Sequence, residues 1–204
     1  MANIALGGAR FIKRRQGSNL EGTEEMPVAS NNSTAIFCGD FVKRVNDGTV
    51  IVAAAGDAIY GIAAGAVRYK SGSGAIVAGN HLPASTTYTG SSVLSNPQAS
   101  IIKVIPLGSG DIIEMDVDTV VADVAAAQSL VGNNFDFVAT AGSTASGRSG
   151  FVINNASGMG TATAQLRMNA VSTDPLNDVT AVNWKAQFIV NETTEPTLGV
   201  ATGV

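Results

Sequence analysis

Apolar residues in most of this chain occur in short runs or alternate with polar residues, and glycine-rich turns separate the runs. This pattern predicts β-strands, because successive side chains of a strand point to opposite faces of a sheet. Asn46-Asp47-Gly48 lies between two apolar runs and predicts a hairpin turn, while Gly61 and Gly65 predict bulges or barrel corners. The strands expected in this part are residues 34–38, 40–45, 49–53, 58–63, 66–69, 100–105 and 112–118.

The last third of the chain repeats this pattern after one helical segment. Residues 120–131 are rich in alanine, with Thr119 placed as an N-cap and Gly132 as a C-terminal stop, so we expect a helix there. The strands expected after it are residues 135–138, 150–153, 165–171 and 183–190. In the last of them Trp184 and Phe188 share a face, which favours a place in the core over a stacking platform for a ligand.

These elements predict a mainly β protein, made of antiparallel β-barrel or sandwich modules with one short helix and an extended N-terminal arm. The expected organisation is a basic arm at 1–26, a barrel-like domain at 27–118, a helical connection at 119–132, a second β module at 133–192 and a flexible tail at 193–204.

The low charge of the chain changes the picture of its surface. Only 14% of its 204 residues are charged, against about 25% in an ordinary soluble domain. We therefore expect shared interfaces with partners or with further copies of the chain to cover part of the surface. A net charge of −4 argues against a general nucleic-acid binder, and no apolar run reaches the length of a membrane helix.

Residues with catalytic or metal-binding chemistry are few. His81 is the single histidine and lies beside Pro83 in a polar stretch, where a solvated loop residue is expected. Cys38 is the single cysteine, so neither an intrachain disulfide nor a thiolate metal cluster can form. Neither a nucleophile elbow nor a phosphate-binding loop occurs. We therefore expect a protein without enzymatic activity, cofactor or metal.

One expected strand carries an unusual row of carboxylates. Glu114, Asp116 and Asp118 alternate with apolar residues and are expected to share one face, where like charges repel. Three interpretations stay open: a solvated face, contact with a basic partner surface, or a cation site.

A basic segment near the N-terminus is the second candidate contact. Lys13, Arg14 and Arg15 follow Phe11 and Ile12, two apolar residues that would be unfavourable in solvent. We favour docking of these residues onto an acidic protein surface over a solubilising patch on a free tail.

The order and spacing of several segments resemble structural proteins of tailed bacteriophages, namely virion proteins of the capsid decoration or cement type. The segments are Pro27-Val-Ala-Ser30, Thr34-Ala-Ile-Phe37, Gly39-Asp-Phe-Val-Lys43, Gly48-Thr-Val50, Gly61-Ile-Ala-Ala-Gly65, Gly132-Asn-Asn-Phe-Asp136, Ser146-Gly-Arg-Ser149 and the strand from Asn183 to Asn191. The resemblance covers residues 27–192, with departures at His81-Leu-Pro83 and at Glu192-Thr193.

The resemblance implies a protein on the exterior of a virion that binds the major capsid protein, forms a homotrimer and stabilises the shell by bridging neighbouring capsid subunits. It implies neither a nucleic-acid nor a membrane partner. The basic segment would then be the capsid contact. The alternative is a head-fibre or adhesin module that binds host-surface carbohydrate, for which Tyr60, Tyr69 and Tyr88 are the candidate aromatic contacts.

Overall fold

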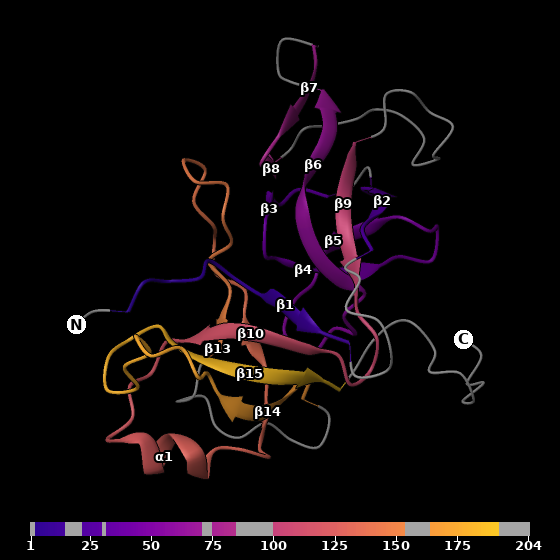
Figure 1. Cartoon of the computed structure of the whole chain (residues 1–204). Coiled ribbons are helices and arrows are strands. Elements are labelled where there is room, and N and C mark those ends of the chain that lie inside the picture. Colours follow the sequence, from indigo (N-terminus) through magenta and orange to yellow (C-terminus); the bar gives the residue numbers. More distant parts are fainter. Residues whose placement is uncertain are drawn as a thin grey trace.

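The computed structural model describes residues 3–14, 22–29, 32–70, 75–84, 100–153 and 164–191. These residues form a mainly β protein with one short helix, which confirms the expected fold class (Figure 1). Two large sheets lie one above the other in this view, and the N-terminal segment runs between them.

The upper sheet curls into a nearly closed barrel. Its strands are hydrogen-bonded in the order β2-β9-β6-β4-β5, and β7 pairs with β6 outside this order. A bridge between Val28 and Val50 joins the two ends of this path, because Val28 directly follows β2 and Val50 begins β5. The strands are β2 (Glu24–Pro27), β4 (Phe41–Arg44), β5 (Val50–Val52), β6 (Gly61–Lys70), β7 (Ile76–Gly79) and β9 (Ile101–Pro106).

The hairpin predicted at residues 46–48 is confirmed. β4 and β5 pair antiparallel with Arg44 opposite Val50, and Gly48 has a φ of 83°. Gly65 is also a confirmed irregular position, with a φ of 127° and a register shift beside it. This glycine lets residues 58–63 and 66–69, which we expected as two strands, contribute to the single long strand β6.

The lower sheet has seven strands. Its path is β11-β14-β15-β10-β13-β12, and β1 also pairs with β10. The strands are β1 (Arg10–Lys13), β10 (Ile112–Val117), β11 (Asn134–Phe135), β12 (Phe137–Val138), β13 (Val152–Ile153), β14 (Leu166–Val171) and β15 (Trp184–Val190). A third, small sheet pairs β3 (Ile36–Phe37), within the strand expected at residues 34–38, with β8 (His81–Leu82), where we expected a loop.

The sheets divide the chain at a different place from the boundary expected at residue 118. β10 pairs with β15 along its full length, so residues 112–117 belong with the C-terminal strands and not with the barrel. The two sheets also share one apolar core. In it, the ring centroids of Phe41 in β4 and Phe137 in β12 lie 4.9 Å apart. A second, smaller cluster fills the barrel interior.

The helix is shorter than predicted. α1 (Val124–Ser129) begins after Asp123, whose side chain accepts a hydrogen bond from the backbone N–H of Ala126. The prediction of Thr119 as N-cap is therefore wrong. Val121 donates its backbone N–H to the Val179 carbonyl. This contact holds the residues before α1 against the loop that precedes β15, so they do not continue the helix. Gly132 follows the helix with a φ of 91°, as its place at the C-terminal end suggested.

Candidate functional site

The N-terminal segment, residues 3–14, lies along the edge of the lower sheet (Figure 1). β1 pairs antiparallel with β10, and the register places Arg10 opposite Glu114 and Phe11 opposite Ile113. At its start, the Asn3 side chain donates to the backbone oxygens of Asp178 and Val182 and accepts from the Asp178 N–H. The segment therefore connects β10 with the loop before β15.

A close crossing of two backbones joins this segment to the barrel. Ala9 donates its N–H to the oxygen of Gly39, and Gly39 donates to Ala63 in β6. On the other side, Cys38 donates its backbone N–H to the oxygen of Gly147, and its own oxygen accepts the backbone N–H of Ser149. Three stretches that are far apart in the sequence thus meet at one junction, which fixes the two sheets relative to each other.

The acidic strand lies beneath this segment. Glu114 is 3% exposed, forms an ion pair with Arg10 and accepts a hydrogen bond from Ser172. Asp116 is 1% exposed and accepts the Leu6 N–H at 2.6 Å. The interpretation as a solvated face is therefore wrong for both residues, because the N-terminal segment covers them and its Arg10 and Leu6 donate to them.

Asp118 lies in a different environment at the end of the strand. It is half-buried, and its carboxylate accepts a hydrogen bond from the Thr119 hydroxyl at 2.8 Å. Within the described ranges, no three histidine, cysteine, aspartate or glutamate side chains lie close enough together to hold a metal ion.

Burial governs the protonation of Asp116. Removal from water raises its pKa to about 6, although the N–H groups of Leu6 and Gly7 and the charge of Lys185 favour the ionised form. Asp40, at the turn before β4, also has its pKa raised to about 6 by burial, and it accepts the Phe37 N–H at 2.8 Å. One buried carboxyl group therefore lies under the N-terminal segment and the other beside the junction.

The chain itself uses part of the basic segment that we expected to contact a capsid. Phe11 is 6% exposed and belongs to the shared core, and Arg14 bonds to Asp111 and to the Pro106 carbonyl at 3.2 Å. Ile12 is half-buried and Lys13 is exposed. Arg15 lies outside the described residues. The acidic surface that receives Arg10 and Arg14 is thus the chain's own strand β10 and the turn before it.

A groove opens beside the first residues of this segment. Its volume is about 280 Å³. The groove is lined by Asn3, Ile4, Ala5, Leu6, Arg148, Asp174, Leu176 and Lys185. Ile4 and Leu176 are 81% and 72% exposed, so apolar side chains stand at its rim.

Two cations line this groove. The Lys185 side chain is 9% exposed, and its ammonium lies 3.8 Å from the Asp174 carboxylate, which is beyond hydrogen-bond distance. Arg148 donates one hydrogen bond, at 3.3 Å, to the Leu6 carbonyl. The alternation of the strand puts Lys185 on the face opposite Trp184, and this alternation alone does not indicate that Lys185 is buried. For Arg148 a signal was present, since it is the single charge within residues 143–150.

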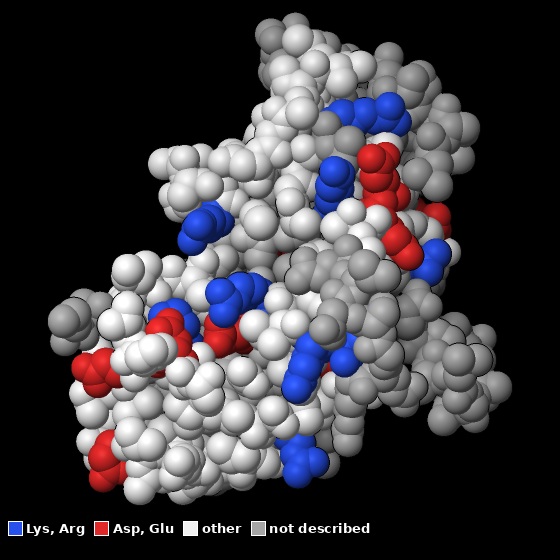
Figure 2. Space-filling model, viewed as in Figure 1, with Lys and Arg blue, Asp and Glu red and all other residues white. Residues whose placement is uncertain are grey.

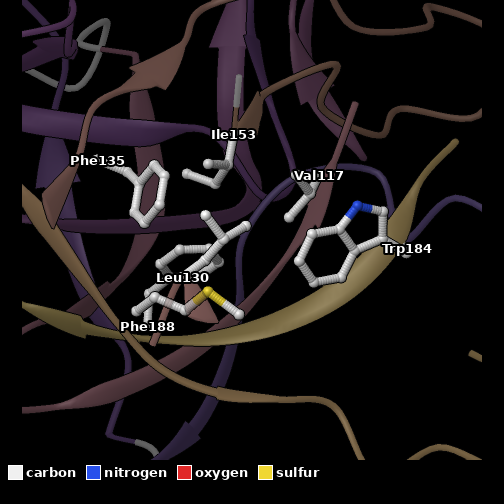
Figure 3. Close-up of a pocket in the computed structure, with 7 residues that line it drawn as sticks. Val117, Leu130, Phe135, Ile153, Trp184 and Phe188 are labelled. Carbon is white, nitrogen blue, oxygen red and sulfur yellow. The ribbon is translucent and has the colours of Figure 1, made fainter. Parts of the chain in front are cut away.

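A second apolar space, lined mainly by side chains of the lower sheet, is fully packed. Figure 3 shows its lining side chains, including Trp184, Phe188 and Phe135, turned toward one another. They leave no room for a water molecule. The Trp184 indole donates to the Thr119 carbonyl at 2.8 Å, and Trp184 and Phe188 are fully buried, which confirms the core interpretation.

The remaining sequence candidates make local contacts. His81 stacks on Phe37 with 5.1 Å between ring centroids, and its Nδ1 lies 2.9 Å from the Asn80 side chain. Tyr60 is buried and its hydroxyl donates to Glu24, while Tyr69 is partly buried against the barrel core. Tyr88 lies outside the described residues.

Comparisons with protein-family models, with curated proteins and with solved structures found no match to this chain. Among the described residues, no helix has the length and apolar character needed to cross a membrane.

Proposed function

We propose that this chain is a structural protein of a phage virion, which binds the outer surface of the capsid and stabilises it by bridging neighbouring capsid subunits. The observation that carries this proposal is the groove with Ile4 and Leu176 exposed at its rim. Exposed apolar side chains beside a cleft are typical of a protein interaction surface.

The sparse charge of the surface supports the same proposal. Figure 2 shows charged side chains in small groups separated by wide uncharged areas. Such a surface suits a module that is covered by neighbouring subunits when it acts.

Two of the segments that resemble decoration proteins meet in the structure. Gly39 and Asp40 lie at the junction with the N-terminal segment, and the stretch Ser146-Gly-Arg-Ser149 contacts them through the Cys38 backbone. These two segments therefore contribute to the contact between the N-terminal segment and the barrel.

In this proposal, the mechanism is mechanical. A module that contacts two capsid subunits adds interface area that must be broken before the subunits separate, and an interface of about 1,600 Å² is the usual size for a specific complex. Three linked copies would bind more tightly than one, because binding of the first raises the effective concentration of the others. We therefore also propose a homotrimer.

The test is binding of the purified chain to phage heads that lack it. Heads are pelleted with increasing amounts of the chain, and a cryo-EM map of the decorated particles locates it. Saturable binding at regular surface positions supports the proposal, together with a higher temperature of head disruption. Pelleting no greater than that of an unrelated β protein would refute it.

A further inference from the structure

We propose that the groove between the N-terminal segment and the loop before β15 binds a carboxylate-bearing, apolar segment of a partner protein. In this arrangement Lys185 and Arg148 receive the carboxylate, and Ile4, Leu6 and Leu176 contact the apolar side chains next to it.

The first argument is the state of the Lys185 ammonium. A buried lysine normally has its charge compensated by direct hydrogen bonds, because removal from water is unfavourable for a charged group. In the described part of the chain, the carboxylate within 4 Å of this ammonium is that of Asp174 at 3.8 Å, too far for a hydrogen bond, and Asp116 opposite it on β10 interacts with it through charge without a hydrogen bond. A ligand carboxylate in the groove would supply the short, charge-assisted bond that Asp174 does not make.

The second argument is the position of Arg148 on the same groove. Its guanidinium has five donors, and one of them binds the Leu6 carbonyl at 3.3 Å. It forms no ion pair with another described residue. With Lys185 it gives the lining two cations against the single carboxylate of Asp174, so the groove favours an anionic group.

The rim indicates a protein segment in place of a small anion. A small carboxylate would be held by the two cations and would leave Ile4 and Leu176 in water. Both side chains are mostly exposed and line the groove, so an extended segment with apolar residues beside its carboxylate covers them when it binds. If the proposed function holds, the segment belongs to a capsid subunit, and that identification alone rests on the proposed function.

A peptide titration tests the groove without capsids. The whole chain, labelled with ¹⁵N, is titrated with acetyl-Leu-Asp-Leu-amide, with the neutral acetyl-Leu-Asn-Leu-amide, and with acetate. We expect the acidic peptide to shift the amide resonances of Ile4, Leu6 and Leu176, and to bind about tenfold more tightly than the neutral peptide. Equal binding of the two peptides would refute the role of the carboxylate. Acetate binding as tight as that of the acidic peptide would refute the protein segment.

Two variants locate the site. Lys185→Met removes the charge but keeps a long side chain at a buried position, whereas Arg148→Gln changes an exposed residue. If Lys185→Met does not fold, Arg148→Gln still tests the site. Each is expected to remove most of the about tenfold preference for the acidic peptide. Lys103→Gln, an exposed change on strand β9 of the barrel, is the matched control and should bind like the parent chain. An unchanged preference in folded Arg148→Gln would overturn the assignment.

The same variants separate the two proposals in the head-binding assay. If the parent chain binds the acidic peptide but not phage heads, the proposed function fails and the groove assignment stands. If the parent chain binds heads and folded Arg148→Gln binds them equally well, the groove is not the capsid contact.

Discussion

Gly8 in the N-terminal segment lies directly against Gly39 at the turn before β4. A Cβ atom added to Gly8 would lie 2.6 Å from the Gly39 carbonyl oxygen and 2.4 Å from the Ser149 Cβ. Gly8 has a φ of 94° and Gly39 a φ of 98°, a region that other residues rarely adopt. This contact connects the N-terminal segment to the barrel, so it is the point where a small change should separate the two.

Substitution Gly8→Ala is expected to lower the free energy of unfolding by more than about 2 kcal/mol, because the methyl group meets both backbone and a buried side chain. The measurement is urea unfolding followed by the emission of Trp184, the only tryptophan in the chain. Gly48→Ala is the matched control, since Gly48 also has a positive φ but no atom lies within 4 Å of its added Cβ. It should lose about 1 kcal/mol. Equal losses in the two variants would contradict the close crossing.

Phe11 should contribute to stability as a core residue. Phe11→Ala is expected to lower the free energy of unfolding by about 3–5 kcal/mol, the range for a large aromatic side chain removed from a packed interior. Ile4→Ala serves as the control in the same segment, because Ile4 is mostly exposed, and should change stability by less than about 0.5 kcal/mol. An unchanged free energy of unfolding in Phe11→Ala would show that β1 does not pack on β10.

The placement of Phe11 also changes what a truncation would do. From the sequence alone, an arm at residues 1–26 is dispensable for folding. In the structure, its removal takes away β1, all but the last residue of β2, a core aromatic, and the donors that Arg10 and Leu6 supply to Glu114 and Asp116. We therefore expect the chain without residues 1–26 to have lost its cooperative unfolding transition, as measured by circular dichroism against denaturant. A truncated chain with the stability of the parent would restore the view of a free arm.

The ion pair between Arg10 and Glu114 should be coupled energetically. Arg10 is more than half exposed whereas Glu114 is buried. Solvent therefore screens the charge of Arg10 but has little access to that of Glu114. A double-mutant cycle with Arg10→Gln and Glu114→Gln is expected to give a coupling energy of about 1 kcal/mol. A cycle of Lys43→Gln and Asp57→Asn, a pair in which both side chains are partly exposed, with 2.8 Å between charged atoms, provides the comparison and should give less. A coupling energy near zero for the first pair would mean that Ser172 alone satisfies Glu114.

Asp116 should make stability depend on pH. Its pKa is raised to about 6 in the folded chain, so the folded state binds this proton more tightly than the unfolded state. Its contribution is therefore fully present below the unfolded pKa and is lost as the pH rises through about 6. Relative to Asp116→Asn, the parent chain should lose about 2 kcal/mol of unfolding free energy between about pH 4 and pH 7.

The pH measurement is urea unfolding of both proteins at several pH values. Asp178→Asn is a control of opposite sign, because hydrogen bonds from Thr180 lower the pKa of Asp178. Its contribution is present above the unfolded pKa and is lost as the pH falls, so that variant should differ from the parent most at neutral pH and approach it at the acid end. Parallel profiles for the parent and Asp116→Asn would show that Asp116 titrates normally.

Local sequence was sufficient for the elements whose structure depends on neighbouring residues. The hairpin at Asn46-Asp47-Gly48 follows from turn residues that accept a positive φ, and the burial of Trp184 and Phe188 follows from the period of a strand. The helix was predicted in the correct region but with the wrong start, because Asp123 and Thr119 are both possible caps. The contact of Val121 with Val179 decided between them.

Tertiary structure alone decided the environment of the charged residues. The alternation in β10 is the same whether its polar face meets water or another segment, so the sequence left the surroundings of Glu114 and Asp116 open, and the structure shows that Leu6 and Arg10 cover them. The burial of Lys185 at the groove was not predictable for the same reason. Each of these contacts joins residues more than 100 positions apart or different elements, and no short-range pattern of hydrophobic and polar residues encodes such a pairing.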